Sequence, residues 1–261
     1  MNPKPKKYFG QHFLIDPHIV SRIVAAIAPK PGEIIVEIGP GPGALTAPLL
    51  LKHSHLHVVE IDRDLAAALV NRYPPEQLTV HEADVLHFDF SQLITDENSV
   101  DKFRAVGNLP YNISTPFLFH LAGFAHLLTD AVFMLQKEVV DRMVAGPDDD
   151  AYGRLSVMLQ YQFALEALFD VPPEAFNPPP KVMSAIVRLQ PLGADRPRAK
   201  SDSHFTHVVA QAFGQRRKML RNTLKSLITE AGLEALDIAP TARAETLSVA
   251  KFIAIADATQ V

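Results

Sequence analysis

The tetrapeptide Asn108-Leu109-Pro110-Tyr111 combines residue types that could hold a planar base through its amino group. Its asparagine offers an amide oxygen, its proline stiffens a turn whose carbonyls can point one way, and its tyrosine offers an aromatic face. The apolar run 103–106 and Gly107 precede it, so it follows a predicted buried strand. Open α/β sheets place their chemistry at such strand ends. A strand-end turn with a packed tyrosine is the structural alternative.

A glycine-rich loop directly follows another predicted buried strand. The strand covers residues 33–38, the loop is Gly39-Pro40-Gly41-Pro42-Gly43, and a helix is expected over residues 44–52. Strand, glycine turn and helix typify a nucleotide-binding opening, because glycines let the backbone approach a ligand closely. The spacing differs from the dinucleotide pattern Gly-x-Gly-x-x-Gly, and no Gly-Lys-Ser/Thr is present for a triphosphate. A purely structural glycine turn is the alternative.

Two acidic residues follow at the ends of the next two predicted strands. Glu60 lies near the end of the predicted strand 56–61, 21 residues after Gly39. A carboxylate at this position can accept hydrogen bonds from both hydroxyls of a ribose. Asp84 follows the strand 78–82 and could accept a hydrogen bond from an adenine amine. Because parallel strands end at one edge of a sheet, we expect both acids, the glycine loop and Asn108 to converge. The convergence predicts an adenosine-type cofactor with its reactive end beside Asn108.

Two further segments could close over this edge. Residues 4–16 carry three lysines ahead of a short apolar stretch, and form either a solvated arm docking one hydrophobic patch or an arm that brings His12 and Leu14 near a ligand. The segment 172–180 is too rich in proline for regular structure, which predicts a stiff extended loop. It presents Phe176, either as a second stacking surface opposite the tyrosine of the tetrapeptide or as a side chain that fills the core.

Composition limits the classes of protein to consider. A chain of 261 residues with 48% hydrophobic content can form one large domain and a small one. No apolar run reaches the length of about eighteen residues needed for a membrane span, and no apolar segment of a secretory signal follows the basic N-terminus. The absence of cysteine excludes disulfides, thiolate metal sites and cysteine nucleophiles. We expect no metal site and a cytoplasmic location.

Positive charge is concentrated near the C-terminus, although the net charge of the chain is −4. No acidic residue lies between Asp202 and Glu230, while five basic residues do: Arg216, Arg217, Lys218, Arg221 and Lys225. The four-residue spacing of Arg217, Arg221 and Lys225 predicts one basic face of a helix, with leucines on another. Such a concentration on an acidic chain indicates a phosphate-binding surface. A solvated basic helix face is the alternative.

Together these elements predict an α/β protein with a Rossmann-like sheet and a small all-α domain. We expect the sheet domain over residues 1–190, including an N-terminal arm of residues 1–16. Residues 191–202 should form a linker, and residues 203–261 the helical domain.

The chain resembles the ribosomal RNA adenine dimethyltransferases, in particular their small-subunit (kasugamycin-sensitivity) branch, nearly from end to end. The segments that carry the resemblance are Lys7-Tyr-Phe-Gly-Gln-His-Phe-Leu-Ile-Asp16, Val36-Glu-Ile-Gly-Pro-Gly-Pro-Gly43, Val59-Glu-Ile-Asp62, Ala83-Asp-Val85, Gly107-Asn-Leu-Pro-Tyr-Asn112, Phe176-Asn-Pro-Pro-Pro-Lys-Val182 and Phe213-Gly-Gln-Arg-Arg-Lys218. The resemblance implies the fold of class I S-adenosylmethionine-dependent methyltransferases, with S-adenosylmethionine as the cofactor.

The resemblance also implies roles for individual residues. The positions matched to the cofactor are His12, Leu14, Gly39, Gly41, Glu60, Asp84 and Asn108, with Asn108 shared between cofactor and substrate. Tyr111 and Phe176 would enclose the target base, and the five basic residues would bind RNA. The family methylates the same nitrogen twice on two adjacent adenosines of small-subunit rRNA. We therefore expect the small ribosomal subunit or its precursor as partner. Separately, we expect a monomeric enzyme.

Two departures from the family pattern are visible. His12 stands where many relatives have asparagine, which could change its contact in kind. The acidic turn Asp148-Asp149-Asp150 replaces a stretch that is often basic or neutral, which could weaken an RNA contact.

Three other functions share parts of this pattern. They are the large-subunit branch that dimethylates a different adenine, an RNA-binding assembly factor that keeps the fold, and a DNA adenine methyltransferase. The Phe-Gly-Gln-Arg-Arg-Lys stretch at 213–218 favours the small-subunit branch, and the intact tetrapeptide and acids favour activity. The C-terminal part is shorter than the base-recognition region usual in DNA adenine methyltransferases.

Overall fold

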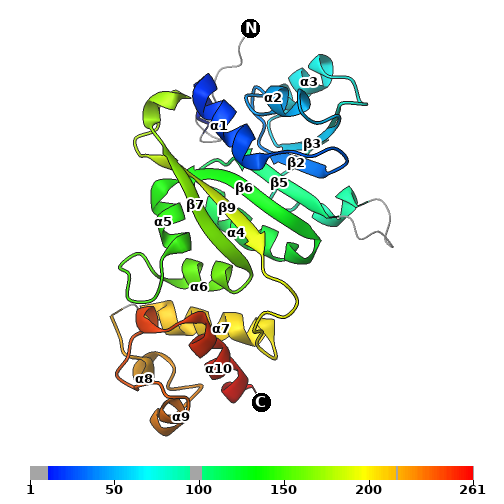
Figure 1. Ribbon diagram of the computed structural model, residues 1–261. Coiled ribbons are helices and arrows are strands. Elements are labelled where there is room, and N and C mark those ends of the chain that lie inside the picture. Colours follow the sequence, from blue (N-terminus) through cyan, green and yellow to red (C-terminus); the bar gives the residue numbers. More distant parts are fainter. Residues whose placement is uncertain (1–10, 95–101, 216, 261) are drawn as a thin grey trace. The chain divides into compact units, whose positions relative to one another are not determined.

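The computed structural model describes residues 11–94, 102–215 and 217–260 of the chain (Figure 1). They form two compact units, one built from residues up to Val140 with Leu165–Pro191, the other from Asp141–Ala164 with Leu192 onward. The predicted division had placed the segment 141–164 in the sheet domain. It belongs instead to the helical unit because Tyr152 and Tyr161 are buried in that unit's apolar core.

The first unit is built on a mostly parallel sheet, which confirms the predicted α/β class. Its strands are β2 (Ile34–Ile38), β3 (Leu56–Glu60), β4 (Leu78–Glu82), β5 (Phe103–Asn108), β6 (Leu128–Gln136), β7 (Phe163–Val171) and β9 (Ser184–Pro191). They lie in the order β4-β3-β2-β5-β6-β9-β7, parallel from β4 to β6, with β9 antiparallel to β6. The order reverses between β2 and β5, which is where such sheets bind ligands.

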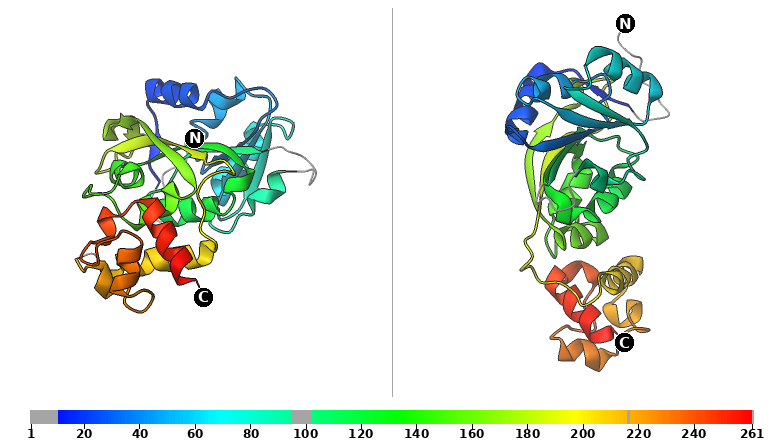
Figure 2. Two further views of the ribbon diagram at one scale, coloured as in Figure 1. Left: turned by 60° about the horizontal axis from the view of Figure 1, so that its bottom comes forward. Right: turned by 90° about the vertical axis from the view of Figure 1, so that its right-hand side faces the viewer.

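Successive side chains of the strands point to opposite faces of the sheet, and apolar side chains are buried on both faces. Helix α1 (Pro17–Ile27) begins at Asp16, whose side chain accepts hydrogen bonds from the backbone N–H groups of residues 18 and 19, at 2.8 and 3.2 Å. Its buried Ile23 and Ile27 join the core formed on one face by Val58 and Val106. Figure 2 shows α1 on one side of the sheet and helix α4 (Ser114–Ala122) on the other.

The opposite face has an aromatic core. Phe117 from α4 packs edge-on against Phe133 of β6, with ring centroids 5.4 Å apart. Phe90 stacks on Phe103 of β5 at 5.2 Å. A sheet covered on both faces keeps its strand ends fixed, so residues that follow those ends have defined positions.

The remaining elements are short. In the first unit they are helices α2 (Thr46–Leu50) and α3 (Arg63–Arg72), and a two-stranded sheet of β1 (Phe13–Leu14) and β8 (Phe176–Asn177). Helix α5 (Lys137–Val144) leads into the helical unit, which contains α6 (Arg154–Gln160), α7 (Asp202–Ala212), α8 (Leu220–Thr223), α9 (Glu230–Ala235) and α10 (Val249–Thr259). Within the described residues, no helix is long and apolar enough to cross a membrane.

Strand β5 runs further than the predicted strand 103–106 and includes Gly107 and Asn108. Both continue the parallel ladder with β6, opposite Phe133 and Met134. Glycine is required here, because a Cβ at position 107 would lie 2.4 Å from the carbonyl oxygen of Ile38 in β2. The close approach of β2 and β5 therefore sets where Asn108 lies.

Substituting this glycine should destabilise the fold. We expect Gly107→Ala to lower the free energy of unfolding by about 1–3 kcal/mol, because the added methyl group pushes β5 away from β2. Gly146→Ala is the matched control, since a Cβ there meets no atom within 4 Å. Urea unfolding of the two variants measures the difference, and equal stabilities would contradict the packing argument.

Candidate active site

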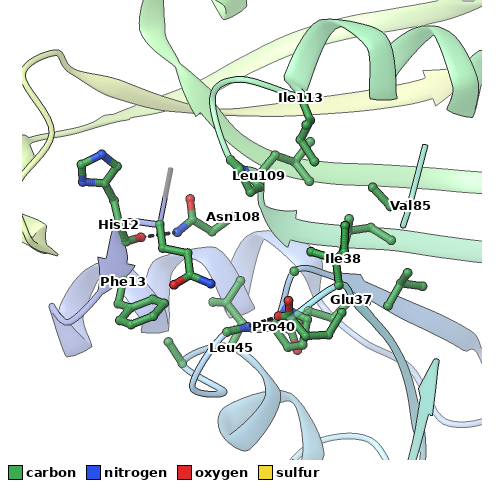
Figure 3. A pocket seen from close by; sticks show the side chains of 18 of the residues that line it. His12, Phe13, Glu37, Ile38, Pro40, Leu45, Val85, Asn108, Leu109 and Ile113 are labelled. Atoms are coloured by element: carbon green, nitrogen blue, oxygen red, sulfur yellow. Dashed lines mark hydrogen bonds between the residues drawn. The ribbon is translucent and has the colours of Figure 1, made fainter. Parts of the chain in front are cut away.

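One cavity lies at the C-terminal ends of β2 to β5 (Figure 3). Its volume is about 380 Å³, within the range of about 300–1,000 Å³ usual for small-molecule sites. All residues predicted at the cofactor line it, namely His12, Leu14, Gly39, Gly41, Glu60, Asp84 and Asn108, and so do Leu109, Pro110 and Tyr111. The structure thus brings together residues from five separate segments of the chain.

Backbone hydrogen bonds hold the loops that line this cavity. The N–H of Gly39 donates to the carbonyl of Val59 at 2.9 Å, just beyond the end of β2. The N–H of Ala83 donates to the backbone carbonyl of Glu60 at 3.1 Å, and the N–H of Leu109 donates to the backbone carbonyl of Met134 at 3.2 Å. Each loop leaves its strand while still bonded to the neighbouring strand. The polar residues that follow are therefore placed by the sheet.

The side-chain amide of Asn108 has one defined orientation. Its Nδ2 donates a hydrogen bond of 3.0 Å to the backbone carbonyl of His12, drawn as a dashed line in Figure 3. A carbonyl can only accept, so the amide nitrogen must face the arm. The amide oxygen of Asn108 then remains as an acceptor at the cavity.

The rest of the tetrapeptide forms a tight turn into α4. The carbonyl of Pro110 accepts from the N–H of Ile113 at 3.2 Å and from the hydroxyl of Ser114 at 3.1 Å. These two hydrogen bonds use both lone pairs of that oxygen. The Leu109 carbonyl is therefore better suited than the Pro110 carbonyl to accept a further hydrogen bond.

The glycine loop wraps around the carboxyl group of Glu60. The N–H of Gly41 donates to one oxygen at 3.1 Å and the N–H of Asp62 to the other at 2.9 Å. Gly39 and Gly41 have φ angles of +62° and +56°, a region that disfavours other residues, and this lets the loop turn back on the acid. Burial raises the pKa of Glu60, against the effect of these hydrogen bonds.

Glu37 also lines the cavity, and the sequence analysis did not select it as a site residue. It lies in β2 with 2% of its surface exposed, and accepts a hydrogen bond of 2.6 Å from the hydroxyl of Thr46. Burial raises the pKa of Glu37 to about 7, and the nearby charge of Glu60 adds to this effect. The signal in the sequence was a single acid within an apolar run directly before the glycine loop.

Residues 11–14 of the N-terminal arm line the cavity and are held at several points. Strand β1 pairs with β8, and the His12 Nδ1–H donates to the carbonyl of Pro178 at 2.8 Å. The imidazole of His12 stacks near the ring of Tyr111, with centroids 5.6 Å apart and an interplanar angle of 26°. Leu14 is 5% exposed. This geometry supports the interpretation of an arm that closes over a ligand.

Of the two interpretations of Phe176, the structure fits the side chain that fills the core. Phe176 is only 2% exposed, does not line the cavity, and belongs to the apolar core on the α1 face of the sheet. The reason is its pairing in β8, opposite Leu14 of β1, which turns the ring inward. The proline-rich segment therefore anchors the arm, and Tyr111 lines the cavity together with Phe13 and His12.

The predicted continuous basic helix is also wrong. The chain turns at Arg217, and α8 covers only residues 220–223, so Arg217, Arg221 and Lys225 do not share one helix. The break coincides with an isolated β-bridge between Met219 and Arg243. Four cations, Arg217, Lys218, Arg221 and Lys225, are exposed, and Arg221 lies 3.9 Å from Glu230. Arg216 and the three N-terminal lysines fall outside the described residues.

The pKa of Glu37 leads to a pH-dependent prediction. Between pH 4.5 and about 7 the carboxyl is ionised in the unfolded chain but protonated in the folded protein, so wild-type stability falls as pH rises through this range. Glu37→Gln keeps an acceptor for Thr46 and removes the titration. We expect it to exceed wild-type stability at pH 8 by up to about 3 kcal/mol, and to match it near pH 4.5. Urea unfolding at both values tests this, and a difference that does not change with pH would contradict it.

Comparisons with known proteins show which family the chain belongs to. The family model for ribosomal RNA adenine dimethylases matches residues 2–260. Relatives named ribosomal RNA small subunit methyltransferase A include that of Aromatoleum aromaticum, 58% identical over 97% of this chain and 93% of its own, and that of Bordetella avium, 57% identical over 97% and 94%.

Solved structures with a similar fold include a dimethyladenosine transferase and an rRNA methyltransferase. A dimethyladenosine transferase from Plasmodium falciparum is 26% identical with a TM-score of 0.78, over 94% of this chain and 96% of that one. The 23S rRNA methyltransferase ErmE has a TM-score of 0.71 over 95% and 99% of the two chains, and at 24% identity shows a shared fold. With a family model that spans nearly the whole sequence, this chain belongs to the ribosomal RNA adenine dimethylase family.

Proposed function

We propose that this enzyme transfers methyl groups from S-adenosylmethionine to the exocyclic amine of two adjacent adenosines in small-subunit (16S) rRNA, giving dimethyladenosine. The observation that carries the proposal is the orientation of Asn108, whose amide oxygen is left as an acceptor beside a cavity with two strand-end acids. The full-length similarity to small-subunit methyltransferases supports the choice of RNA.

The residues at the cavity fit S-adenosylmethionine. Glu60 lies at the end of β3, where its carboxylate can accept the two ribose hydroxyls, and Asp84 follows β4, where it can accept from the adenine amine. Gly39 and Gly41 permit close approach of the backbone, and the arm covers the site with His12 and Leu14. The bound cofactor would supply a methyl group made electrophilic by its sulfonium.

The tetrapeptide would activate the target adenine. An exocyclic amine is a weak nucleophile because its lone pair is delocalised into the ring. The Asn108 amide oxygen and the Leu109 carbonyl would accept its two hydrogens, which favours a tetrahedral nitrogen and frees the lone pair. Fixed acceptors of this kind act by position and electrostatics, and cost no reorganisation during the reaction.

Tyr111 would provide the stacking surface for the flipped base. Its ring lines the cavity directly after the two acceptors. Flipped bases are commonly read by acceptors on their edge and held by aromatic rings on their face. Since Phe176 is buried in the core, a single aromatic side chain would serve here. Phe176 would act indirectly, through the pairing of β8 with the arm.

The helical unit would bind the RNA backbone. Its exposed cations Arg217, Lys218, Arg221 and Lys225 suit phosphate contacts, which add affinity without selecting sequence. Arg216 extends the same basic segment in the sequence. The partner would be the small ribosomal subunit or its precursor, in the cytoplasm, and the enzyme would act as a monomer.

Removing the amide of Asn108 should strongly reduce the rate of methyl transfer. We expect Asn108→Ala to lose about 100-fold or more in rate, because the amine loses one of two fixed acceptors. The assay supplies labelled S-adenosylmethionine and small subunits from a strain lacking the modification, followed by nucleoside analysis. Asn71→Ala, at an exposed position of α3, is the control and should behave as wild type.

The outcomes separate the competing functions. Dimethyladenosine in small-subunit RNA with wild type, and almost none with Asn108→Ala, supports the proposal. Label in large-subunit RNA alone would assign the enzyme to the other branch. No label in either RNA, despite cofactor binding, would favour an RNA-binding assembly factor.

A further inference from the structure

The hydroxyl of Tyr111 meets a buried serine that the sequence analysis did not select. The hydroxyl oxygens of Tyr111 and Ser184 lie 2.8 Å apart, although the two residues are 73 positions apart in sequence. Ser184 is 0% exposed. It opens β9 and pairs with Gln136 at the end of β6, so it is held by the ladder of the main sheet.

This contact fixes the direction of the Tyr111 ring. A tyrosine side chain turns about two torsions, and its ring can present its face in several directions unless the far end is held. The Ser184 hydroxyl holds that end. A pair of hydroxyls can be bonded only at close range, so the bond restricts where the ring points.

The ring of Tyr111 has a second contact, with the imidazole of His12, which is a stacking contact and not a hydrogen bond. The centroids of the His12 and Tyr111 rings lie 5.6 Å apart. His12 belongs to the arm, and its Nδ1–H donates a hydrogen bond to the carbonyl of Pro178. A base inserted between two rings would need centroids roughly 7 Å apart, since stacked faces are separated by about 3.5 Å. Entry of a base on this face would therefore displace His12. The bond to Ser184 would not need to break.

The hydrogen bond is not required for packing of the aromatic ring. Phenylalanine has the same ring without the hydroxyl, and Tyr111 lines the cavity rather than the core. The bond instead connects the rigid sheet to one wall of the cavity. A contact that leaves packing unchanged but sets the angle of a stacking surface is expected to affect substrate positioning more than folding.

We propose that Ser184 is a positioning residue that fixes the ring of Tyr111 as the stacking surface for the target adenine. The inference rests on the proposed function, because it assumes that this ring receives the base. Ser184 touches neither cofactor nor substrate, and acts through Tyr111 alone.

The test is a double-mutant cycle with steady-state kinetics. Ser184→Ala, Tyr111→Phe and the double variant are assayed with small-subunit particles over a range of concentrations. Each single variant should lose about three- to ten-fold in kcat/KM, because each removes the same hydrogen bond. The double variant should lose no more than either single one. Affinity for S-adenosylmethionine, measured by calorimetry, should change less than about two-fold.

Tyr152→Phe is the matched control. The hydroxyl of Tyr152 is buried in the helical unit and donates to the carbonyl of Leu247 at 2.9 Å. Its loss should lower thermal stability and leave kcat/KM unchanged. Should Ser184→Ala fail to fold, Tyr111→Phe removes the same bond from the cavity side.

Two failures are distinguishable. An active wild type with unchanged kcat/KM in Ser184→Ala or Tyr111→Phe, or with additive losses in the double variant, would overturn the role of Ser184. A wild type that binds cofactor but methylates neither particle would overturn the proposed function, and with it the reason for holding this ring.

Discussion

The hydrogen bond from the Asn108 amide to the carbonyl of His12 connects the two parts on which the site depends. One partner is fixed by the sheet, because Gly107 lets β5 pass close to β2 and continue to Asn108. The other belongs to the arm, which pairs with β8 and covers the glycine loop. The bond gives the amide its orientation, and so decides whether an acceptor or a donor faces the cavity.

The electrostatics of the cavity follow from the same arrangement. Two carboxyl groups, Glu37 and Glu60, are buried beside a loop of positive-φ glycines. Backbone N–H groups at Gly41 and Asp62 bond to one of them, and the Thr46 hydroxyl bonds to the other. Burial keeps the pKa of Glu37 near 7, so this group is neutral in part of the population at physiological pH. Burying these carboxyl groups lowers the stability of the fold at the place where polar groups must face a ligand.

The sequence was sufficient for the parts of the site that depend on local pattern. Apolar runs predicted the parallel strands, and parallel strands must end at one edge, so the placement of Glu60, Asp84 and Asn108 followed. Long-range pairing decided the rest. Phe176 turned inward because β8 pairs with a strand more than 160 residues away, and the basic segment broke near a bridge between Met219 and Arg243. Periodicity carries no information on such contacts.

The two compact units differ from the predicted division for a similar reason. Residues 141–164 follow the sheet strands in sequence, yet their aromatic side chains complete the core of the helical unit. The proline-rich segment is comparable, since its composition predicted an extended chain but not that it would anchor the arm. Where a segment packs depends on surfaces contributed by distant parts of the chain.

A crystal structure of the protein with S-adenosylmethionine would show how the cofactor lies in this cavity. We expect the ribose hydroxyls on Glu60, the adenine amine near Asp84, and the sulfonium methyl group facing the amide oxygen of Asn108, with the bond to the His12 carbonyl intact. A cofactor bound elsewhere, or an Asn108 amide turned so that its nitrogen faces the methyl group, would contradict this expectation.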